Sequence, residues 1–444
     1  MTSVKVKGQS IAAFKVLAMI FIVSLTSCKK DDHIPGKGPQ PSKYSSEVLD
    51  KWMTLQLRLM RNGTGTPNHA YARHYAYSGI AALQSLAPGF HGHNDWLGKW
   101  NGLTGLPAIE KNMHYYYPAN VNAAMAAINR SFFPNAGEAD KSAIDSLENA
   151  LQSEFLQTQP QSVINRSANY GKAVAAAVFN WAETDGYKNA NAPYTPPVGP
   201  GLWVPTAQGA TALTPYWGNN RPVVRGSLDN TRPAAPIAYS TVPGSPFYQM
   251  VKTVYDASQN LTEDQKAMAI FWRDVPGVSS PGHWLSILQQ VIKKRGANLD
   301  KAALSYALTG AAINDAIISC WEAKYYYNLL RPVTYIRNVM GHGTWAPQLV
   351  STPSHPDYPS GHAVLSGAGA EAMERMFGNI GTFTDNTYVY MGLGSRSYSS
   401  FTAIGKEAAM SRVYGGIHFV QTADISLKQG KKVTDNIFSK GKHY

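Results

Sequence analysis

The chain has 444 residues, of which 44% are hydrophobic and 15% charged, a composition that is typical of a globular protein and excludes a disordered one. The formal net charge is +12, which favours anionic ligands or anionic surfaces as partners. The sequence has neither a clustered basic stripe nor a nucleic-acid-binding motif. We therefore expect no nucleic acid among its partners.

The first residues have the order of a secretory signal. Lys5 and Lys7 precede a short apolar run at 16–23, and Leu25-Thr26-Ser27-Cys28 resembles a bacterial lipobox, in which the cysteine is lipidated. We expect a lipoprotein signal peptide at 1–27 and lipidation of Cys28; a plain secretory signal is the alternative.

The residues after Cys28 predict where the protein is held. Lys29-Lys30-Asp31-Asp32 resembles a signal that exports lipoproteins to the outer cell surface, and 28–45 reads as a flexible tether. We expect an outer-membrane lipoprotein exposed at the cell surface, with a periplasm-facing position as the alternative. No later run reaches the roughly 18 apolar residues of a membrane span, so we expect the lipid to be the sole membrane contact.

The body of the chain is dominated by helical periodicity, and strand signals are few. The fold class expected is all-α, built of helical bundles, with an N-terminal helical half at 46–189, a loop-rich insert rich in Pro, Gly, Tyr and Trp at 190–246, and a C-terminal helical half at 247–444. We expect the insert to cover the functional site. The helices predicted are 46–60, 68–86, 120–132, 139–157, 162–184, 247–258, 263–273, 281–294, 298–330, 363–377 and 403–420.

Two further features concern metal binding and the cysteines. His91-Gly92-His93-Asn94-Asp95 suggests metal binding, but it lies among glycines without a matching ligand partner, so we do not expect a metal there. Cys320 falls in an apolar stretch, where we expect a small buried hydrophobe and no disulfide with Cys28.

The most informative stretch is Pro359-Ser360-Gly361-His362. The prolines exclude a helix before Ser360, and the residues that follow favour one, so Ser360 is predicted as an N-cap with His362 in the first turn. A helix start with a hydroxyl, free N–H groups and an imidazole is suited to bind an oxyanion. An ordinary capped helix with an incidental histidine is the alternative.

Two further segments carry cations and a histidine. Lys324 and Arg331 are seven residues apart, so on one continuous helix both would face the same side, about 10 Å apart. The apolar residues around them favour cations drawn inward over a solvated basic face. Downstream, Arg412 and His418 flank the glycine pair Gly415-Gly416, which allows close backbone approach. A structural core histidine is the alternative reading of His418.

Together, Lys-x6-Arg-Pro, Pro-Ser-Gly-His and Ser-Arg-x5-His resemble the signature of the type 2 phosphatidic acid phosphatase and vanadium-dependent haloperoxidase superfamily. The motifs span 324–418. The resemblance implies a site that holds phosphate or vanadate. Its cofactor-binding residues would be Lys324, Arg331, Ser360, Gly361, His362, Arg412 and His418, with the two histidines and three cations as the catalytic set.

The resemblance also implies two chemistries for this site. In a haloperoxidase, His418 would be the metal ligand of a vanadate cofactor, His362 the acid–base partner, and the substrates hydrogen peroxide and a halide, with an organic acceptor as a further partner. In a soluble phosphomonoesterase, His418 would attack phosphorus and His362 would protonate the leaving group. The length and the long insert favour the haloperoxidase. A non-catalytic surface lipoprotein that captures a ligand is a third hypothesis, which the intact motif set disfavours.

Three positions near the motifs refine this expectation. His355 stands where bromoperoxidases of the family resemble one another in carrying histidine, which favours bromide or iodide; a surface loop histidine is the alternative. Trp321 lies one turn before Lys324, where it would line the pocket, with core packing as the equal alternative. The family often has aspartate four residues after the ligand histidine, but this chain has Thr422. The sequence therefore leaves open which residue orients His418.

Overall fold

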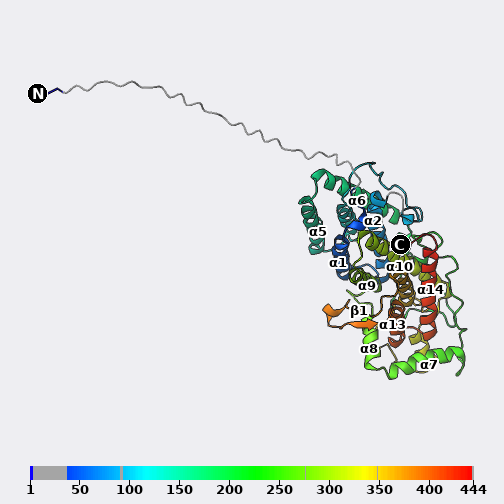
Figure 1. The fold of residues 1–444 in the computed structure, drawn as a ribbon. Helices are drawn as coiled ribbons and strands as arrows, with labels where there is room; N and C mark the ends of the chain where they lie inside the picture. The colour runs from blue at the N-terminus through cyan, green and yellow to red at the C-terminus, as the bar shows by residue number, and fades with distance from the viewer. Residues whose placement is uncertain (4–37, 91–93, 276, 348, 443–444) are drawn as a thin grey trace.

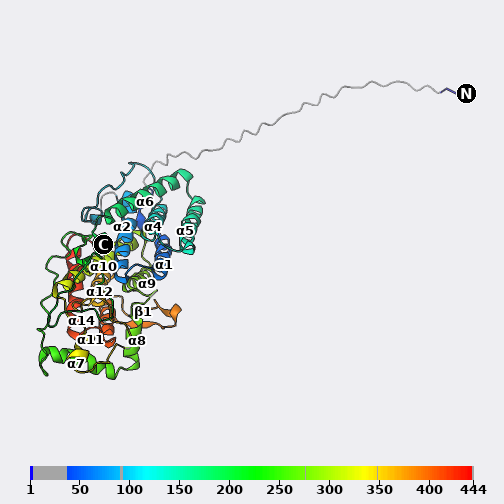
Figure 2. The ribbon, with the colours of Figure 1, turned by 180° about the vertical axis from the view of Figure 1, so that it is seen from behind.

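The structure is a computed structural model that describes residues 1–3, 38–90, 94–275, 277–347 and 349–442. The regular secondary structure of its described part is helical except for one two-stranded hairpin, which confirms the all-α prediction (Figure 1, Figure 2). The signal peptide and Cys28 lie outside the described residues. The α-helices are α1 Glu47–Asn62, α2 Tyr71–Ser85, α3 Ala87–Phe90, α4 Tyr117–Phe132, α5 Glu138–Leu156, α6 Gln161–Ala182, α7 Pro246–Gln259, α8 Glu263–Phe271, α9 Ser280–Arg295, α10 Leu299–Tyr327, α11 Pro332–Asn338, α12 Gly361–Phe377, α13 Phe401–Tyr414 and α14 Val420–Phe438.

The long helix α10 forms the centre of the molecule. It packs against α2 from the N-terminal half and against α12 and α14 from the C-terminal half, so the two halves share one core. Within the described part, α10 alone is long and apolar enough to cross a membrane, but its apolar window is wholly buried. Its hydrophobicity is therefore explained by its place in the core.

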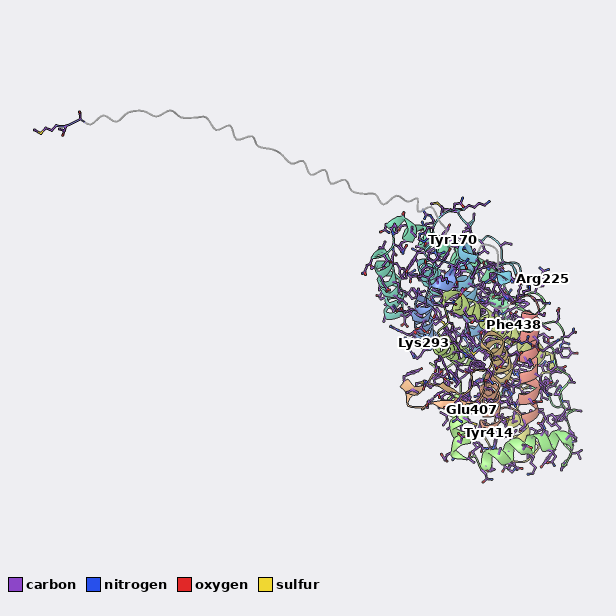
Figure 3. The ribbon with its side chains drawn as sticks, viewed as in Figure 1. Tyr170, Arg225, Lys293, Glu407, Tyr414 and Phe438 are labelled. Carbon is purple, nitrogen blue, oxygen red and sulfur yellow. The ribbon has the colours of Figure 1, made fainter. Side chains whose placement is uncertain are left out.

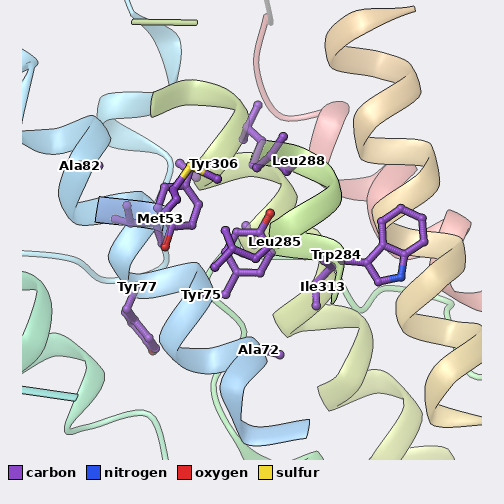
Figure 4. Close-up of a cluster of buried hydrophobic side chains, with 14 of the residues drawn as sticks. Met53, Ala72, Tyr75, Tyr77, Ala82, Trp284, Leu285, Leu288, Tyr306 and Ile313 are labelled. Carbon is purple, nitrogen blue, oxygen red and sulfur yellow. The ribbon is translucent and has the colours of Figure 1, made fainter. Parts of the chain in front are cut away.

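Aromatic side chains fill the core between these helices. Tyr75 of α2 packs against Tyr306 of α10, with ring centroids 5.1 Å apart, and Leu285 of α9 lies beside them (Figure 4). Trp284 reaches from α9 to α12, where its indole N–H donates to Ser366 Oγ at 3.0 Å. A buried indole with its N–H satisfied stabilises one packing arrangement over others. The core thereby fixes α12, whose first turn carries the Ser-Gly-His motif.

Two helix crossings depend on glycine. A Cβ at Gly79 of α2 would lie 2.8 Å from the backbone of Tyr306, and a Cβ at Gly430 of α14 would lie 1.9 Å from the carbonyl of Val364 on α12. These helices approach more closely than any side chain would permit. The crossings of α10 with α2 and of α12 with α14 therefore have little freedom to shift, and the second includes Val364, two residues after His362.

The insert at 190–246 has no regular strands, only isolated bridges such as Leu202 with Leu329. It lies along α10, where the Tyr325 hydroxyl donates to Leu213 O at 2.8 Å. The end of the predicted tether also packs on the body, which corrects the boundary at residue 45. Pro41 is buried, and Leu299 N donates to Tyr44 O at 2.9 Å, because the first turn of α10 needs backbone acceptors for its free N–H groups.

A small β-hairpin was not predicted. Strands β1 Phe383–Asp385 and β2 Arg396–Tyr398 pair antiparallel and project from the helical body (Figure 1). Asp385 lies 2.6 Å from His283 Nε2, and the ring of His283 stacks on Trp272 at 4.1 Å.

The hairpin holds Trp272 from a second side as well. Arg396 and Tyr398 donate to Glu407 at 2.6 and 2.7 Å, and Glu407 accepts the indole N–H of Trp272 at 3.1 Å (Glu407 is labelled in Figure 3). The hairpin therefore fixes Trp272, whose carbonyl lies in the functional site.

Candidate functional site

A cavity of about 280 Å³ lies where the three sequence motifs meet. Its wall includes α10 through Trp321, the start of α12 through Gly361 and His362, and the insert through Leu213. The placement of Leu213 agrees with the expectation that the insert covers the site. Among the predicted residues, Trp321, His355, Gly361, His362, Arg412 and His418 line this cavity directly.

Lys324 and Arg331 are both buried, but not as one helix face. Helix α10 ends at Tyr327 because Asn328 takes a left-handed conformation with φ of 48°, and Arg331 is instead the N-cap of α11. This corrects the predicted helix to residue 330. Lys324 Nζ donates to Pro356 O at 2.8 Å, and Arg331 Nε donates to His355 O at 2.8 Å. Both cations therefore bind the loop that leads into the Ser-Gly-His motif.

Lys324 and Arg331 are buried beside a single carboxylate, with Asp357 Oδ1 4.0 Å from Arg331 Nη1, and this burial has an electrostatic cost. It lowers the pKa of Lys324 to about 7 and that of Arg331 to about 10, although the nearby Asp357 raises both. Burial likewise lowers the pKa of Arg412, which is 2% exposed, to about 10. Buried cations that lack a full set of counter-charges favour the binding of an anion beside them.

His362 and Arg412 are joined by one backbone carbonyl. His362 Nε2 lies 3.0 Å from Trp272 O, and Arg412 Nη1 donates to the same oxygen at 2.9 Å. Burial, and next the charge of Arg412, lower the pKa of His362 well below its usual value. The ring is therefore neutral at pH 7, and its contact with a carbonyl places the proton on Nε2.

Two buried polar atoms beside these residues have no partner within the described part of the chain. Ser360 is fully buried and occupies the N-cap of α12 as predicted, but its hydroxyl does not cap the helix and its Oγ has no hydrogen-bond partner there. Arg412 Nε is likewise buried without a hydrogen-bond partner there. Unsatisfied buried donors are costly, so their retention beside three cations fits a site that binds an oxyanion.

His418 lies in the linker between α13 and α14, which corrects the predicted helix at 403–420. Helix α13 ends at Tyr414 because Gly416 takes a φ of +74°, and α14 begins at Val420. Arg331 Nη1 lies 3.2 Å from His418 Nε2, and burial, followed by the charge of Arg331, lowers the pKa of His418 well below its usual value. The imidazole is therefore neutral, with a lone pair on Nε2.

The residue that faces the other nitrogen of His418 is Asp357, which the sequence analysis missed. Asp357 Oδ1 lies 2.9 Å from His418 Nδ1, a contact too bent to be a full hydrogen bond, and Thr422 Oγ1 donates to Asp357 Oδ2 at 2.9 Å. Burial raises the pKa of Asp357 to about 6, against the lowering effects of Arg331 and Lys324. At neutral pH the carboxylate is ionised and favours a proton on Nδ1, which leaves Nε2 free as a ligand.

An aromatic wall closes the cavity on another side. His69, also missed by the sequence analysis, stacks on Trp321 with centroids 4.2 Å apart, and Trp321 leans on His355 at 5.1 Å. His355 Nδ1 accepts a hydrogen bond from Arg331 Nη2 at 2.9 Å. Burial lowers the pKa of His69 to about 3 and that of His355 well below its usual value, so both are uncharged.

Other predicted features lie elsewhere. Cys320 is buried and free, with its Sγ 3.7 Å from Pro359 O. Residues 91–93 of the His91–Asp95 segment lie outside the described residues. Within the described ranges, no group of three His, Cys, Asp or Glu side chains could hold a metal ion by themselves.

Comparisons with known proteins agree with this geometry. Residues 304–444 match the family model described as "VCPO second helical-bundle domain". The crystal structure of the first bacterial vanadium-dependent iodoperoxidase is similar to this chain, with 30% sequence identity, a TM-score of 0.79, and coverage of 91% of this chain and 98% of that one.

Two other solved structures share the fold. The apo-type bacterial vanadium-dependent chloroperoxidase has 19% identity and a TM-score of 0.61 over 84% of this chain and 93% of its own. The holo-type enzyme has 18% identity and a TM-score of 0.60 over 92% and 95%. No curated protein matches the chain. Because the iodoperoxidase likeness extends over almost the full length of both chains, the chain belongs to the vanadium-dependent haloperoxidase family, whose members are oxidoreductases.

Proposed function

We propose that this enzyme binds vanadate and oxidises iodide or bromide with hydrogen peroxide. The observation that carries the proposal is a cavity lined by Arg412, His362 and His418. Lys324 and Arg331 are buried against the loop that lines this cavity through His355, and the unpartnered Ser360 hydroxyl lies at the start of α12. The cations match an anion, and the unprotonated Nε2 of His418, which accepts from Arg331 Nη1 at 3.2 Å, matches a metal centre inside that anion. The balanced reaction is X⁻ + H₂O₂ + H⁺ → HOX + H₂O.

Each residue has a separate part in this proposal. Lys324, Arg331 and Arg412 would neutralise the oxygens of the cofactor, with Arg forks suited to pairs of oxygens. Ser360 Oγ and the Gly361 N–H would add hydrogen bonds at the start of α12. His418 would hold the metal through Nε2. When bound, vanadate supplies a Lewis acid that activates peroxide without a change of its oxidation state.

His362 would carry out the proton transfer. Its ring is neutral and is held by the Trp272 carbonyl at 3.0 Å from Nε2. The reaction consumes one proton and releases water, so a neutral imidazole at the cavity wall can take a proton from peroxide and return it to the departing oxygen. Asp274 Oδ2, 3.6 Å from His362 Nε2, would stabilise the imidazolium that forms in between.

Iodide and bromide are proposed over chloride for two reasons. His355 stands at the position that distinguishes bromoperoxidases in the family resemblance, and the iodoperoxidase shares 30% sequence identity with this chain, against 18% and 19% for the chloroperoxidases. His355 and Trp321 also make one side of the cavity wall aromatic and uncharged, an environment that accepts a large, weakly hydrated anion more readily than a small one.

The test is a vanadate titration of protein prepared without phosphate. We expect oxidation of iodide and bromide by hydrogen peroxide to rise from background to saturation as orthovanadate is added. An aryl phosphate assay runs in parallel. If vanadate produces no halide oxidation and only inhibits phosphate ester hydrolysis, the site is a phosphatase site with His418 as nucleophile, and the proposal is wrong.

For localisation, we propose a lipid anchor on Cys28 that holds the enzyme at the outer membrane, facing the cell surface. The support is the sequence Leu25-Thr26-Ser27-Cys28 with its downstream Lys-Lys-Asp-Asp. We expect radiolabelled palmitate to enter the protein and to be lost in Cys28→Ser, and protease added to intact cells to degrade it. Labelling that persists in Cys28→Ser would contradict the anchor, and protection from protease would place the enzyme in the periplasm.

A further inference from the structure

Arg273 lines the same cavity as the oxyanion residues, but it is not part of any motif. It stands with His362, Arg412 and His418 in the cavity wall. Lys324, Arg331 and Arg412 are almost completely buried, whereas Arg273 is partly exposed. Solvent and small ions can therefore reach Arg273 without passing the three buried cations.

The guanidinium of Arg273 has no counter-charge in the described part of the structure. Its Nε is buried and lacks a hydrogen-bond partner there. By contrast, Lys324 donates to Pro356 O, Arg331 donates to His355 O, and Arg412 donates to Trp272 O. A partly desolvated Arg without an acceptor attracts any small anion that enters the cavity.

The adjacent carboxylate does not supply the missing charge. Asp274 directs Oδ1 to the N–H and hydroxyl of Ser280, at 3.0 and 3.2 Å, and Oδ2 towards His362. Asp274 and Arg273 form no ion pair within the described residues. The carboxylate is thus committed to the start of α9 and to the histidine, and the Arg273 charge stays uncompensated.

The backbone on both sides of Arg273 is fixed to the site. On one side, the Trp272 carbonyl contacts His362 and Arg412 at 3.0 and 2.9 Å. On the other side, Asp274 is held by Ser280. Arg273 therefore stands one peptide bond from the atom that holds His362, and its side chain projects from a rigid base into the cavity wall.

We propose that Arg273 is the halide-binding residue of this cavity, which collects iodide or bromide from solvent and holds it beside the oxyanion site. This inference rests on the proposed function, because it names the residue that binds the second substrate. The guanidinium is more weakly hydrated than an ammonium, and large halides are weakly hydrated too. Both therefore lose little hydration free energy when they come into contact. The aromatic wall of His69 and Trp321 lies in the same cavity.

The kinetic test compares variants of the vanadate-loaded enzyme. We expect Arg273→Gln to raise KM for iodide about tenfold, the usual effect of losing one charge-assisted contact, with kcat changed less than about twofold. Arg273→Lys, which keeps the charge, should recover part of the loss. Arg225→Gln removes the same charge from an exposed position outside the cavity and should leave KM unchanged (Arg225 is labelled in Figure 3).

The vanadate dissociation constant separates a halide role from an oxyanion role. In Arg273→Gln this constant should stay within about twofold of the native value, because the oxyanion-binding residues described above do not include Arg273. If Arg273→Gln weakens vanadate binding while KM for iodide stays constant, Arg273 belongs to the oxyanion cradle and the inference is overturned. An unchanged KM together with unchanged vanadate affinity overturns it as well.

A structural readout is independent of turnover. Crystals of the full chain soaked in sodium iodide should show an anomalous peak beside the Arg273 guanidinium that is absent in Arg273→Gln. If the native protein shows the iodide peak but KM for iodide is unchanged in Arg273→Gln, the ion binds at crystal concentration only. That result would overturn the halide-binding role of Arg273. If the native protein oxidises no halide, the proposed function fails, while the peak still decides whether Arg273 binds halide.

Discussion

Replacement of His418 by alanine should abolish vanadate-dependent halide oxidation while the protein stays folded. His418 lies in the cavity wall with an unprotonated Nε2 that is 3.2 Å from Arg331 Nη1, and with its Nδ1 2.9 Å from Asp357 Oδ1. A lost metal ligand removes several kcal/mol of stabilisation, which corresponds to about a thousandfold or more in rate. The rate of iodide oxidation at saturating peroxide, measured across a vanadate series, checks this.

The control for this variant must separate loss of chemistry from loss of structure. His342→Ala removes an imidazole that stacks on Tyr255 outside the cavity, with centroids 4.0 Å apart, and should leave the rate unchanged. Both variants should keep a cooperative thermal transition. Residual vanadate-dependent oxidation above one tenth of the native rate in His418→Ala would show that another group holds the metal, and the assignment of His418 would be wrong.

The parts of the site that the sequence predicted are those tied to local chemistry. Ser360 could be placed as an N-cap because prolines precede it and helix-forming residues follow it, and the structure has it there. Lys324 and Arg331 could be expected inside because their neighbours are apolar, and both are buried. The class of the fold followed from helical periodicity, since the apolar face of a helix must be covered by another element.

The parts that could not be predicted depend on where helices end and on contacts between distant segments. Asn328 ends α10 in a left-handed turn, and this turns Arg331 into the cap of α11, which no periodicity reveals. His69 lies in the turn before α2 and reaches the cavity because α2 packs on α10. The carbonyl of Trp272 comes from the turn between α8 and α9 and contacts His362 and Arg412. A backbone carbonyl has no signal in the sequence at all.

Asp357 shows the same limitation within a motif. In sequence it is one acid between two prolines, without any indication of its partner. The fold brings the α13–α14 linker over it, so that its carboxylate faces His418 while Thr422 donates to its other oxygen. Thr422, four residues after His418, therefore still acts on the histidine. It does not supply a carboxylate itself, but its hydroxyl holds the carboxylate of Asp357, which faces His418.

A carboxylate at position 422 should therefore partly replace the one lost from position 357. We expect Asp357→Ala to weaken vanadate binding about 10- to 100-fold, the usual effect of losing the partner that orients a ligand histidine. The double variant Asp357→Ala with Thr422→Asp returns a carboxylate to the neighbourhood of Nδ1 and should recover at least part of the loss. Asp424→Asn, which removes an exposed acid paired with Lys428, should have no effect.

Calorimetric titration with vanadate measures the affinities, and ¹⁵N shifts of the labelled histidines report the His418 tautomer without any turnover. In the native protein the proton should be on Nδ1, and in Asp357→Ala the two tautomers should mix, because the ionised carboxylate no longer favours one of them. Thermal unfolding of each variant separates this effect from a loss of structure. Full vanadate affinity and an unchanged tautomer in Asp357→Ala would show that Arg331 alone orients the ring, and Asp357 would then serve to balance the buried charge of Lys324 and Arg331.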